Sequence, residues 1–408
     1  MQQITAKDVL VLIQRTINSV DHRLENHGEQ VAYMSWVMFW MMGYRESDLL
    51  RLTSLAMMHD IGAYKPDEQR RLTEIEVFNP HEHCVYGYLF LREFSPDPAL
   101  APVILYHHWR YSHADKIIAG VPIPRESAVI HLVDRVSVLF AQTGKDLKPA
   151  VLKFFPFQRG SWFDPELVDQ LLRLTAETDF IDKLVNGEYL AEVYQMLEGI
   201  PVSDEDLLGY MRLLANVIDF RGHHTACHSR QVQAVAHELC ELAGITDREE
   251  RHKCELAALV QGVGRMSVPI DAFAIDGVSK NGNDHLEIIR KTRQATADIL
   301  ADGGFRALSA AIADGGAAQA PLYKEIVIAA DAFVTLIEAH MDSENAVHLL
   351  KRMMIDGHLG ERAYVIISDH HHRLCDRMAL AQSGVGKQYE AITAEYKTLI
   401  QEMRKTAL

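Results

Sequence analysis

Apolar residues recur at intervals of three and four through most of the chain, with polar and charged residues between them. This spacing is typical of amphipathic α-helices, because side chains three and four positions apart lie on the same helical face. Few stretches alternate with a period of two, so a sheet-based fold is not expected. The sequence therefore predicts an all-α fold class, with helices over residues 48–58, 85–94, 165–178, 230–243, 249–260 and 323–339.

The longest apolar run, YMSWVMFWMMG over residues 33–43, is interrupted by Ser35 and is too short to span a bilayer. We expect it to form a buried helix. The first residues lack a basic segment followed by an apolar one and a cleavage site, so no signal peptide is expected. Five scattered cysteines without a CxxC pair fit a reducing compartment. These features predict a cytoplasmic protein with no membrane segment.

The sequence resembles itself at a nearly constant offset. Matched pairs are His27 with His228, Gly43 with Gly244, Gly62 with Gly264, and Asp134 with Asp331. Such matching favours a tandem duplication, and the alternative is chance similarity between two helical domains. The segment GIPVSDEDL interrupts the helical pattern near residues 200–205. We therefore predict one domain over residues 1–200 and a second over 205–408.

Charge and histidine content narrow the classes of function. The chain has 41 Lys and Arg against 56 Asp and Glu, a formal net charge of −15, without a long basic stretch. Binding of duplex nucleic acid by neutralising its phosphates is therefore not expected. A phosphorylated substrate would need metal ions to supply local positive charge. Histidine, the commonest metal ligand, accounts for 21 of 408 residues.

The first half carries a set of candidate metal ligands, namely His27, His59, Asp60, His83, His107, His108 and Asp134. A carboxylate has two oxygens, so Asp60 could bridge two cations. One cation would be held by His27, His59 and Asp134, and the other by His83, His107 and His108. Mixed nitrogen and oxygen ligands suit transition metals better than calcium. The alternative for any single histidine is an ordinary structural role.

The order H … HD … H-x-x-x-G … HH … D resembles the HD superfamily of metal-dependent phosphohydrolases, most closely its HD-GYP branch. Members of that branch hydrolyse cyclic di-nucleotides, chiefly cyclic di-GMP. The matching stretches are HGEQVA (27–32), MMHDIGAYK (57–65), HCVYG (83–87), LYHHWRY (105–111), IPRESAVIHLVDR (123–135) and GSWFDPELV (160–168). The resemblance implies helical HD-domain bundles and two divalent metal ions that activate a water molecule. Iron or manganese is favoured, with zinc, nickel and magnesium as alternatives.

The chain also departs from the family pattern. Ala63 stands where the family has a lysine, and the nearest lysine is Lys65. Trp109 replaces the glutamate that follows the histidine pair, and the Gly-Tyr-Pro signature is reduced to GVP at 120–122. At the positions of a third-metal site the chain has Arg23 and Ser137, so two metals are expected. Loss of the signature loop affects the prediction of the substrate more than that of hydrolysis.

Asp60 and Lys65 are the candidate catalytic residues. Lys65, Arg110 and Arg135 are the basic residues nearest the motifs and are candidates to bind phosphate, since guanidinium groups match phosphate oxygens. Trp109 is a candidate to stack on a nucleobase. The alternatives are solvated surface charges and, for the tryptophan, packing in the core.

The second copy keeps His228 and Asp331 but has Gln261-Gly262 in place of the doublet. The segment TRQAT (292–296) stands where H-x-x-x-G is expected, and no histidine pair follows. Glutamine and glycine offer neither imidazole nor carboxylate, so we expect no di-metal site there. The second copy is predicted to be a degenerate domain that serves dimerisation, regulation or ligand sensing.

The leading prediction is a metal-dependent phosphodiesterase in signalling, with a cyclic di-GMP-like nucleotide as substrate and a homodimer formed through the degenerate domain. One alternative is a phosphohydrolase of another nucleotide, such as a deoxynucleotide or an alarmone. The other is a non-catalytic HD-type signalling or scaffold protein.

Overall fold

The computed structural model describes residues 4–18, 26–63, 81–221, 227–267, 282–313, 320–339 and 341–406. Every regular element in these ranges is a helix, and β-pairing is limited to isolated bridges. The all-α prediction is confirmed. No helix in the described ranges is long and apolar enough to cross a membrane.

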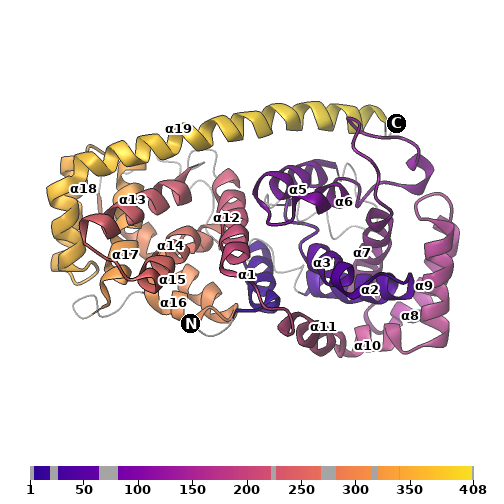
Figure 1. Cartoon of the computed structure of the whole chain (residues 1–408). Helices are drawn as coiled ribbons and strands as arrows, with labels where there is room; N and C mark the ends of the chain where they lie inside the picture. Colours follow the sequence, from indigo (N-terminus) through magenta and orange to yellow (C-terminus); the bar gives the residue numbers. More distant parts are fainter. Residues whose placement is uncertain are drawn as a thin grey trace. The chain divides into compact units, whose positions relative to one another are not determined.

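The chain divides into two compact units (Figure 1). Unit 1 comprises residues 1–206 together with 392–408, and unit 2 comprises residues 207–391. The last helix, α19 (Glu361–Thr406), has 46 residues, and its sequence is therefore shared between the two units. A division of the sequence into two halves does not anticipate that the final residues belong to unit 1.

Unit 1 is a helical bundle whose central helix, α2, packs against α3 and α7, while α5 packs against α6. Tyr106, Phe39, Phe90 and Phe155 are fully buried in its core. Its helices are α1 (Ala6–Asn18), α2 (His27–Met41), α3 (Glu46–Met57), α5 (His81–Phe94), α6 (Ala101–Leu105), α7 (Arg125–Thr143), α8 (Leu147–Gln158), α9 (Pro165–Glu177), α10 (Phe180–Asn186) and α11 (Tyr189–Glu198).

Helix α2 contains most of the long apolar run. Met34, Met38 and Phe39 are buried, as expected, whereas Trp40 is 66% exposed at the end of the helix. The expectation of a buried helix therefore holds for most of the run, but Trp36 and Val37 are half-buried, and Trp40 and Met41 at its end are exposed.

Unit 2 repeats the pairings of unit 1, because α13 packs against α14 and α17, and α15 packs against α16. Its helices are α12 (Asp204–Arg221), α13 (His228–Leu242), α14 (Arg248–Val260), α15 (Gly282–Asp302), α16 (Arg306–Ile312), α17 (Leu322–Glu338), α18 (Ser343–Ile355) and the first part of α19. All six helices predicted from periodicity are present, with ends that differ by a few residues.

A glycine in the segment that directly follows α3 in unit 1 and α14 in unit 2 allows a close approach of α5 and of α15, respectively. A Cβ atom on Gly62 would lie 2.1 Å from the backbone oxygen of His83, and one on Gly264 would lie 2.2 Å from that of Thr292. Only glycine leaves room for such contacts. In unit 1 this approach brings the turn that carries Asp60 against the first turn of α5. The same contact in both units supports the interpretation of a duplication.

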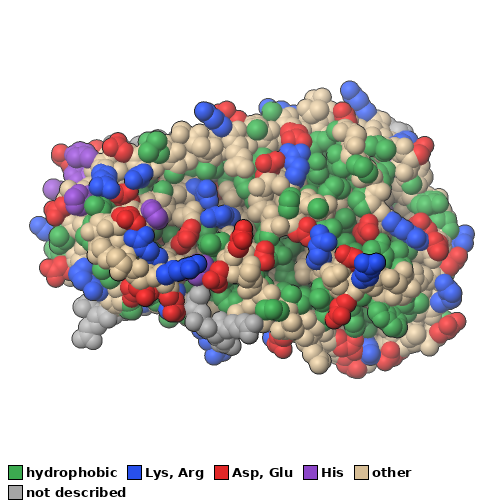
Figure 2. Space-filling model, viewed as in Figure 1, with side chains coloured by type: hydrophobic (Ala, Val, Ile, Leu, Met, Phe, Trp, Pro, Cys, Tyr) green, Lys and Arg blue, Asp and Glu red, His purple; other side chains and the backbone are tan. Residues whose placement is uncertain are grey.

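Acidic and basic side chains are interspersed among apolar ones over the described residues of the face shown in Figure 2. A protein that follows a nucleic-acid backbone concentrates Lys and Arg in a stripe or patch. The mixed pattern on this face therefore agrees with the negative net charge in disfavouring such a partner.

Candidate metal centre

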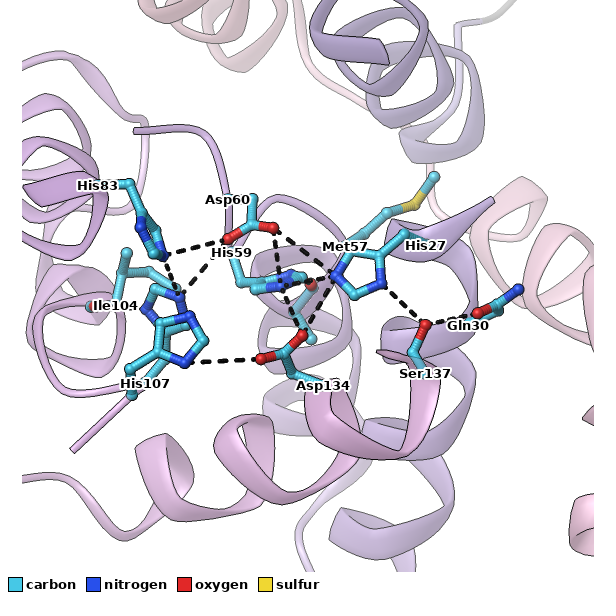
Figure 3. A network of polar contacts seen from close by, with 12 residues as sticks. His27, Gln30, Met57, His59, Asp60, His83, Ile104, His107, Asp134 and Ser137 are labelled. Atoms are coloured by element: carbon cyan, nitrogen blue, oxygen red, sulfur yellow. Dashed lines mark hydrogen bonds and ion pairs between the residues drawn. The ribbon is translucent and has the colours of Figure 1, made fainter. Parts of the chain in front are cut away.

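The seven predicted ligands come together in unit 1, and all of them are buried. Figure 3 labels all of them except His108. They come from five segments that are distant in sequence. These are the start of α2 (His27), the turn after α3 (His59, Asp60), the start of α5 (His83), the turn after α6 (His107, His108) and the middle of α7 (Asp134).

Asp60 lies between two pairs of histidines (Figure 3). Its Oδ1 is 3.5 Å from Nε2 of His83 and 3.6 Å from Nε2 of His107. Its Oδ2 is 3.4 Å from Nε2 of His59 and 3.7 Å from Nε2 of His27. Each carboxylate oxygen therefore faces a different pair, which is the placement that a bridging ligand requires.

Backbone carbonyls fix the tautomers of two of these histidines. Nδ1 of His59 lies 2.8 Å from the oxygen of Ala56, and Nδ1 of His107 lies 2.7 Å from that of Ile104. A carbonyl oxygen can only accept, so each Nδ1 donates a proton, and in the neutral ring each Nε2 presents its lone pair to the centre. Such support of the distal ring nitrogen is the usual arrangement of metal-ligating histidines.

A side-chain relay does the same for His27. The Ser137 hydroxyl donates to Oε1 of Gln30 at 2.5 Å, which leaves its oxygen to accept from Nδ1 of His27 at 2.8 Å. Nε2 of His27 is thereby also left with its lone pair facing the centre. Ser137, which stands at a third-metal position of the family, acts here as a partner of a ligand.

The paired imidazole nitrogens are close to one another. Nε2 of His27 is 3.3 Å from Nε2 of His59, and Nε2 of His83 is 3.1 Å from Nε2 of His107. Two lone pairs at this separation repel unless a proton or a cation lies near both. Oδ1 of Asp60 and Nε2 of His108 are also buried without a hydrogen-bond partner in the described part of the chain. Buried polar atoms of this kind need an explanation, and bound cations supply one.

Asp134 completes the first group of ligands and is held by Arg135. Its Oδ1 is 3.3 Å from Nε2 of His27, and its Oδ2 is 3.6 Å from Nδ1 of His108. The same Oδ2 accepts from Nε and Nη2 of Arg135 at 3.0 and 2.7 Å. Although burial opposes ionisation, the guanidinium of Arg135 and the neighbouring histidines hold the pKa of Asp134 well below its usual range.

The electrostatics of the histidines suit cation binding. Burial lowers the pKa of His83 to about 3 and that of His108 well below its ordinary value, so both imidazoles are neutral at neutral pH. Neutral imidazole is the form that binds metals. Burial acts in the same direction on His59, but Asp60 and Asp134 outweigh it and raise the pKa of His59 to about 9. The two carboxylates thus favour positive charge at the first group.

Cys84 is a neighbour of the site that the sequence reasoning missed. Its Sγ is 3.8 Å from Nε2 of His83 and 4.0 Å from Nε2 of His107. His83, Cys84, His107 and His108 can all present a ligand atom to one small volume. The sequence signal for this neighbour is its position directly after His83 in the motif HCVYG. Cysteine can ligate a metal outside a disulfide framework or a CxxC pair.

The other predicted site residues have diverse surroundings. Trp109 is buried, and its indole N–H donates to the backbone oxygen of His113 at 2.8 Å. The guanidinium of Arg110, an exposed residue, lies 4.6 Å from the centre of the Trp162 ring. Arg135 is buried against Asp134, and Lys65 lies outside the described residues. Substrate binding by these four residues stays a prediction.

The corresponding place in unit 2 contains a histidine that is bonded at both ring nitrogens. Nε2 of His228 is 3.1 Å from Oδ1 of Asp331 and 3.0 Å from Nε2 of Gln261. Nδ1 of His228 is 2.8 Å from Oε2 of Glu338 and 3.2 Å from Nη2 of Arg265. Burial and Arg265 lower the pKa of His228, but Glu338 and Asp331 outweigh them and raise it. These contacts satisfy the ring without a metal.

A bundle of α-helices with a buried His-Asp doublet at its centre defines the class of HD-domain proteins. The family model described as "HD domain" matches residues 24–139. HD phosphohydrolases bind divalent metal ions, and the cluster of unit 1 offers the ligands for them.

Two curated proteins are similar to the chain. The 3'3'-cGAMP-specific phosphodiesterase 1 of Vibrio cholerae is 26% identical over 280 residues, which cover 65% of this chain and 64% of that protein. The cyclic di-GMP phosphodiesterase response regulator RpfG of Xanthomonas campestris pv. campestris is 28% identical over 190 residues, which cover 43% of this chain and 50% of that protein. The chain thus matches less than two thirds of the length of either relative.

The fold also has a solved counterpart. The crystal structure of the cyclic GMP-AMP specific phosphodiesterase V-cGAP3 of Vibrio cholerae matches with a TM-score of 0.63 at 15% identity, covering 91% of this chain and 98% of that one. Residues 24–139 are thus an HD domain, and the chain is homologous to cyclic dinucleotide phosphodiesterases of the HD-GYP type. The resemblance expected from the sequence motifs is confirmed.

Proposed function

We propose that unit 1 is a metal-dependent phosphodiesterase that hydrolyses a cyclic dinucleotide. The observation that carries this proposal is the position of Asp60, whose two oxygens face two separate pairs of buried histidines. The relatives named for cyclic GMP-AMP and cyclic di-GMP hydrolysis support the substrate class. They do not select between the two nucleotides.

Two divalent ions fit the residues present. His27, His59 and Asp134 would hold one ion, His83, His107 and His108 the other, and Asp60 would bridge them. Iron or manganese is favoured by this mixture of imidazole and carboxylate. When bound, the ions supply an activated water molecule for attack on phosphorus and positive charge against the phosphate oxygens.

The chain itself orients these ligands. The backbone oxygens of Ala56 and Ile104 fix two imidazoles, and Ser137 fixes a third. Arg135 keeps Asp134 ionised and acts through that carboxylate. Lys65 and Arg110 are the proposed phosphate-binding residues, and the ring of Trp109 packs against that of Tyr106.

A substrate panel tests the proposal. The purified chain, loaded with Mn²⁺ or Fe²⁺, is assayed against cyclic di-GMP, 3'3'-cGAMP, a linear dinucleotide and a deoxynucleoside triphosphate. We expect a cyclic dinucleotide to be opened faster than the other substrates. Asp60→Ala and His59→Ala should abolish hydrolysis and lower the metal content measured by elemental analysis, because each removes a ligand.

Gln261→Ala is the matched control, since Gln261 occupies the place of the doublet in unit 2. It should leave hydrolysis and metal content unchanged. If the chain hydrolyses only the linear dinucleotide or the deoxynucleoside triphosphate, the proposal is wrong about the substrate class, and the alternative of a phosphohydrolase of another nucleotide is correct. If the wild-type chain holds no metal and hydrolyses nothing with added Mn²⁺ or Fe²⁺, the non-catalytic alternative is correct.

The same proposal includes a signalling role in the cytoplasm and a homodimer formed through unit 2. Both rest on the sequence and on the substrate class. Sedimentation of the full chain measures the oligomeric state directly.

A further inference from the structure

Unit 2 contains a cavity of about 700 Å³ whose wall is formed by residues of α13, α14 and α19. This volume lies in the range of pockets that admit small molecules. The charged and titratable groups on its wall are Arg230, His237, Glu238, Arg251, Glu255 and Arg377. Two cysteines, Cys240 and Cys254, also line it, which gives a dissolved small molecule a route to both sulfurs.

The two cysteines form a close pair. Cys240 lies on α13 and Cys254 on α14, and their sulfur atoms are 3.4 Å apart. Their residues are 3% and 2% exposed, so the pair is shielded from larger molecules. A disulfide requires the sulfurs to approach to about 2.05 Å, which is a short movement from this separation.

Arg251 distinguishes the two thiols. Its guanidinium is held by Oε1 of Glu241 and the backbone oxygen of Ile245, both at 2.6 Å. The hydrogen bond with Cys254 and the charge of Arg251 lower the pKa of Cys240, against burial and the charges of Glu241 and Glu250. The same hydrogen bond, together with burial, raises the pKa of Cys254 well above its ordinary value. The reactive thiolate is therefore expected on Cys240.

We propose that Cys240 and Cys254 are a redox-sensitive modification site that closes reversibly to a disulfide when a peroxide enters the cavity. The thiolate of Cys240 attacks one oxygen of hydrogen peroxide, an S–O bond forms and the O–O bond breaks. Cys240 becomes a sulfenic acid, and the leaving hydroxide takes up the proton released by the Cys240 thiol and departs as water. Cys254 then attacks the Cys240 sulfur, the S–S bond forms and a second water molecule leaves. The two thiols lose two electrons and two protons, and the peroxide gains them. A dithiol reductant reverses the change.

The disulfide would join α13, which begins at His228, to α14, which Gln261 directly follows. It would also bond two parts of the cavity wall to each other. In a reducing compartment such pairs are transient and act in redox sensing. This inference concerns unit 2 alone and does not depend on the proposed activity of unit 1.

Thiol counting and peptide mapping of the full chain test the inference. The reduced chain is exposed to a small excess of hydrogen peroxide and then alkylated under denaturing conditions. We expect the five thiols to fall by two. We further expect a non-reduced digest to contain a peptide with Cys240 joined to Cys254, which disappears after treatment with dithiothreitol. Cys375→Ser is the matched control and should form the same bond.

Cys254→Ser cannot form the disulfide. After brief exposure to peroxide, its Cys240 should carry a sulfenic acid that a dimedone probe labels, and its other three thiols should remain intact. If that variant does not fold, mapping of the wild-type chain decides alone. Five intact thiols after peroxide treatment, a bond between other cysteines, or a bond between two chains would each overturn the inference.

Discussion

The buried polar groups at the centres of the two units differ in how they find partners. In unit 1, imidazole lone pairs and carboxylate oxygens face one another, and Asp60 and His108 keep unpartnered atoms within the described residues. In unit 2, the ring of His228 is bonded on both sides to side chains. Arg265, which follows Gly264 as Ala63 follows Gly62, places a guanidinium beside that ring. Under the proposed function, the first centre would be completed by metal ions, whereas the second has the guanidinium of Arg265 beside its histidine.

If the two units arose by duplication, as the sequence predicts, the difference indicates how a metal site could be lost while the fold is kept. Oδ1 of Asp331 lies 3.1 Å from Nε2 of His228, and Oε2 of Glu338 lies 2.8 Å from Nδ1, so both nitrogens of this imidazole have partners without a metal. The helix pairings and the glycine contact are kept. A buried polar group needs a partner, and the partner need not be an ion.

The largest effect is expected from the two glycines. Gly62→Ala and Gly264→Ala should each destabilise their own unit by about 3 kcal/mol, because the added Cβ would overlap a backbone oxygen that cannot turn away. Gly62→Ala should also abolish hydrolysis, whereas Gly264→Ala should leave the active unit intact. Urea unfolding with hydrogen exchange assigned to each unit measures both effects.

Gly386→Ala is the control for these substitutions, since a Cβ at this position in α19 meets nothing within 4 Å. It should be neutral or slightly stabilising. If either core glycine accepts alanine as readily as Gly386 does, the two units are not built on a shared close contact.

A smaller effect, on metal affinity, is expected from the side chains that contact Nδ1 of His27 in unit 1 and of His228 in unit 2. Ser137→Ala removes the acceptor of the His27 Nδ1 proton and should weaken metal binding by about 10- to 100-fold. Glu338→Gln changes the group that contacts Nδ1 of His228 and should leave metal binding unchanged. Calorimetric titration with Mn²⁺ measures both affinities. Equal affinities for Ser137→Ala and wild type would contradict the role assigned to Ser137.

At any one pH near neutrality, the smallest change per pH unit is expected from two buried groups with opposite pH dependences. Burial, aided by Arg135, lowers the pKa of His131 in unit 1 to about 3, so its contribution to stability is complete above about pH 6.5 and is lost as the pH falls toward 3. Burial raises the pKa of Asp219 in unit 2 to about 7, despite its hydrogen bonds with Ser229. Its contribution is complete below about pH 3.8 and is lost as the pH rises toward 7.

Each slope should be at most about 1.4 kcal/mol per pH unit. The differences in unfolding free energy between wild type and His131→Phe, and between wild type and Asp219→Asn, isolate the two groups from the other carboxylates. The first difference should shrink toward acid and the second toward base. Slopes of the same sign would refute the assignment of the two buried groups.

The fold and the clustering of the candidate ligands were largely predictable, for a physical reason. Helical periodicity reports burial directly, and the six predicted helices are all present. The order of histidines and aspartates pointed to seven residues that the structure brings together, and their role as ligands stays a prediction. The neighbours that hold them were not predictable. Ala56, Ile104 and Ser137 act through a backbone oxygen or a hydroxyl, and neither leaves a recognisable pattern in a single sequence.

The other features that the sequence did not predict depend on contacts between distant segments of the chain. The burial of Trp109 and the pairing of Arg135 with Asp134 depend on how segments meet in three dimensions. The approach of Cys240 to Cys254 depends on the packing of α13 against α14, which periodicity predicts only as two separate helices. The assignment of the last residues to unit 1 has no local signal at all.

Because residues 392–408 belong to unit 1, this unit cannot complete its contacts until the end of the chain has been synthesised. Within unit 1, Tyr396 stacks on Tyr86 with ring centres 4.0 Å apart, and Glu395 accepts both Nη atoms of Arg92 at 2.6 Å. Glu402 accepts from the backbone nitrogen of Ala119 at 2.8 Å. The ribosome releases these partners only after all of unit 2 has been synthesised. Unit 1, whose synthesis begins first, is thus the last to gain its full set of contacts. A gene fragment that stops after residue 206 encodes unit 1 without the last part of α19.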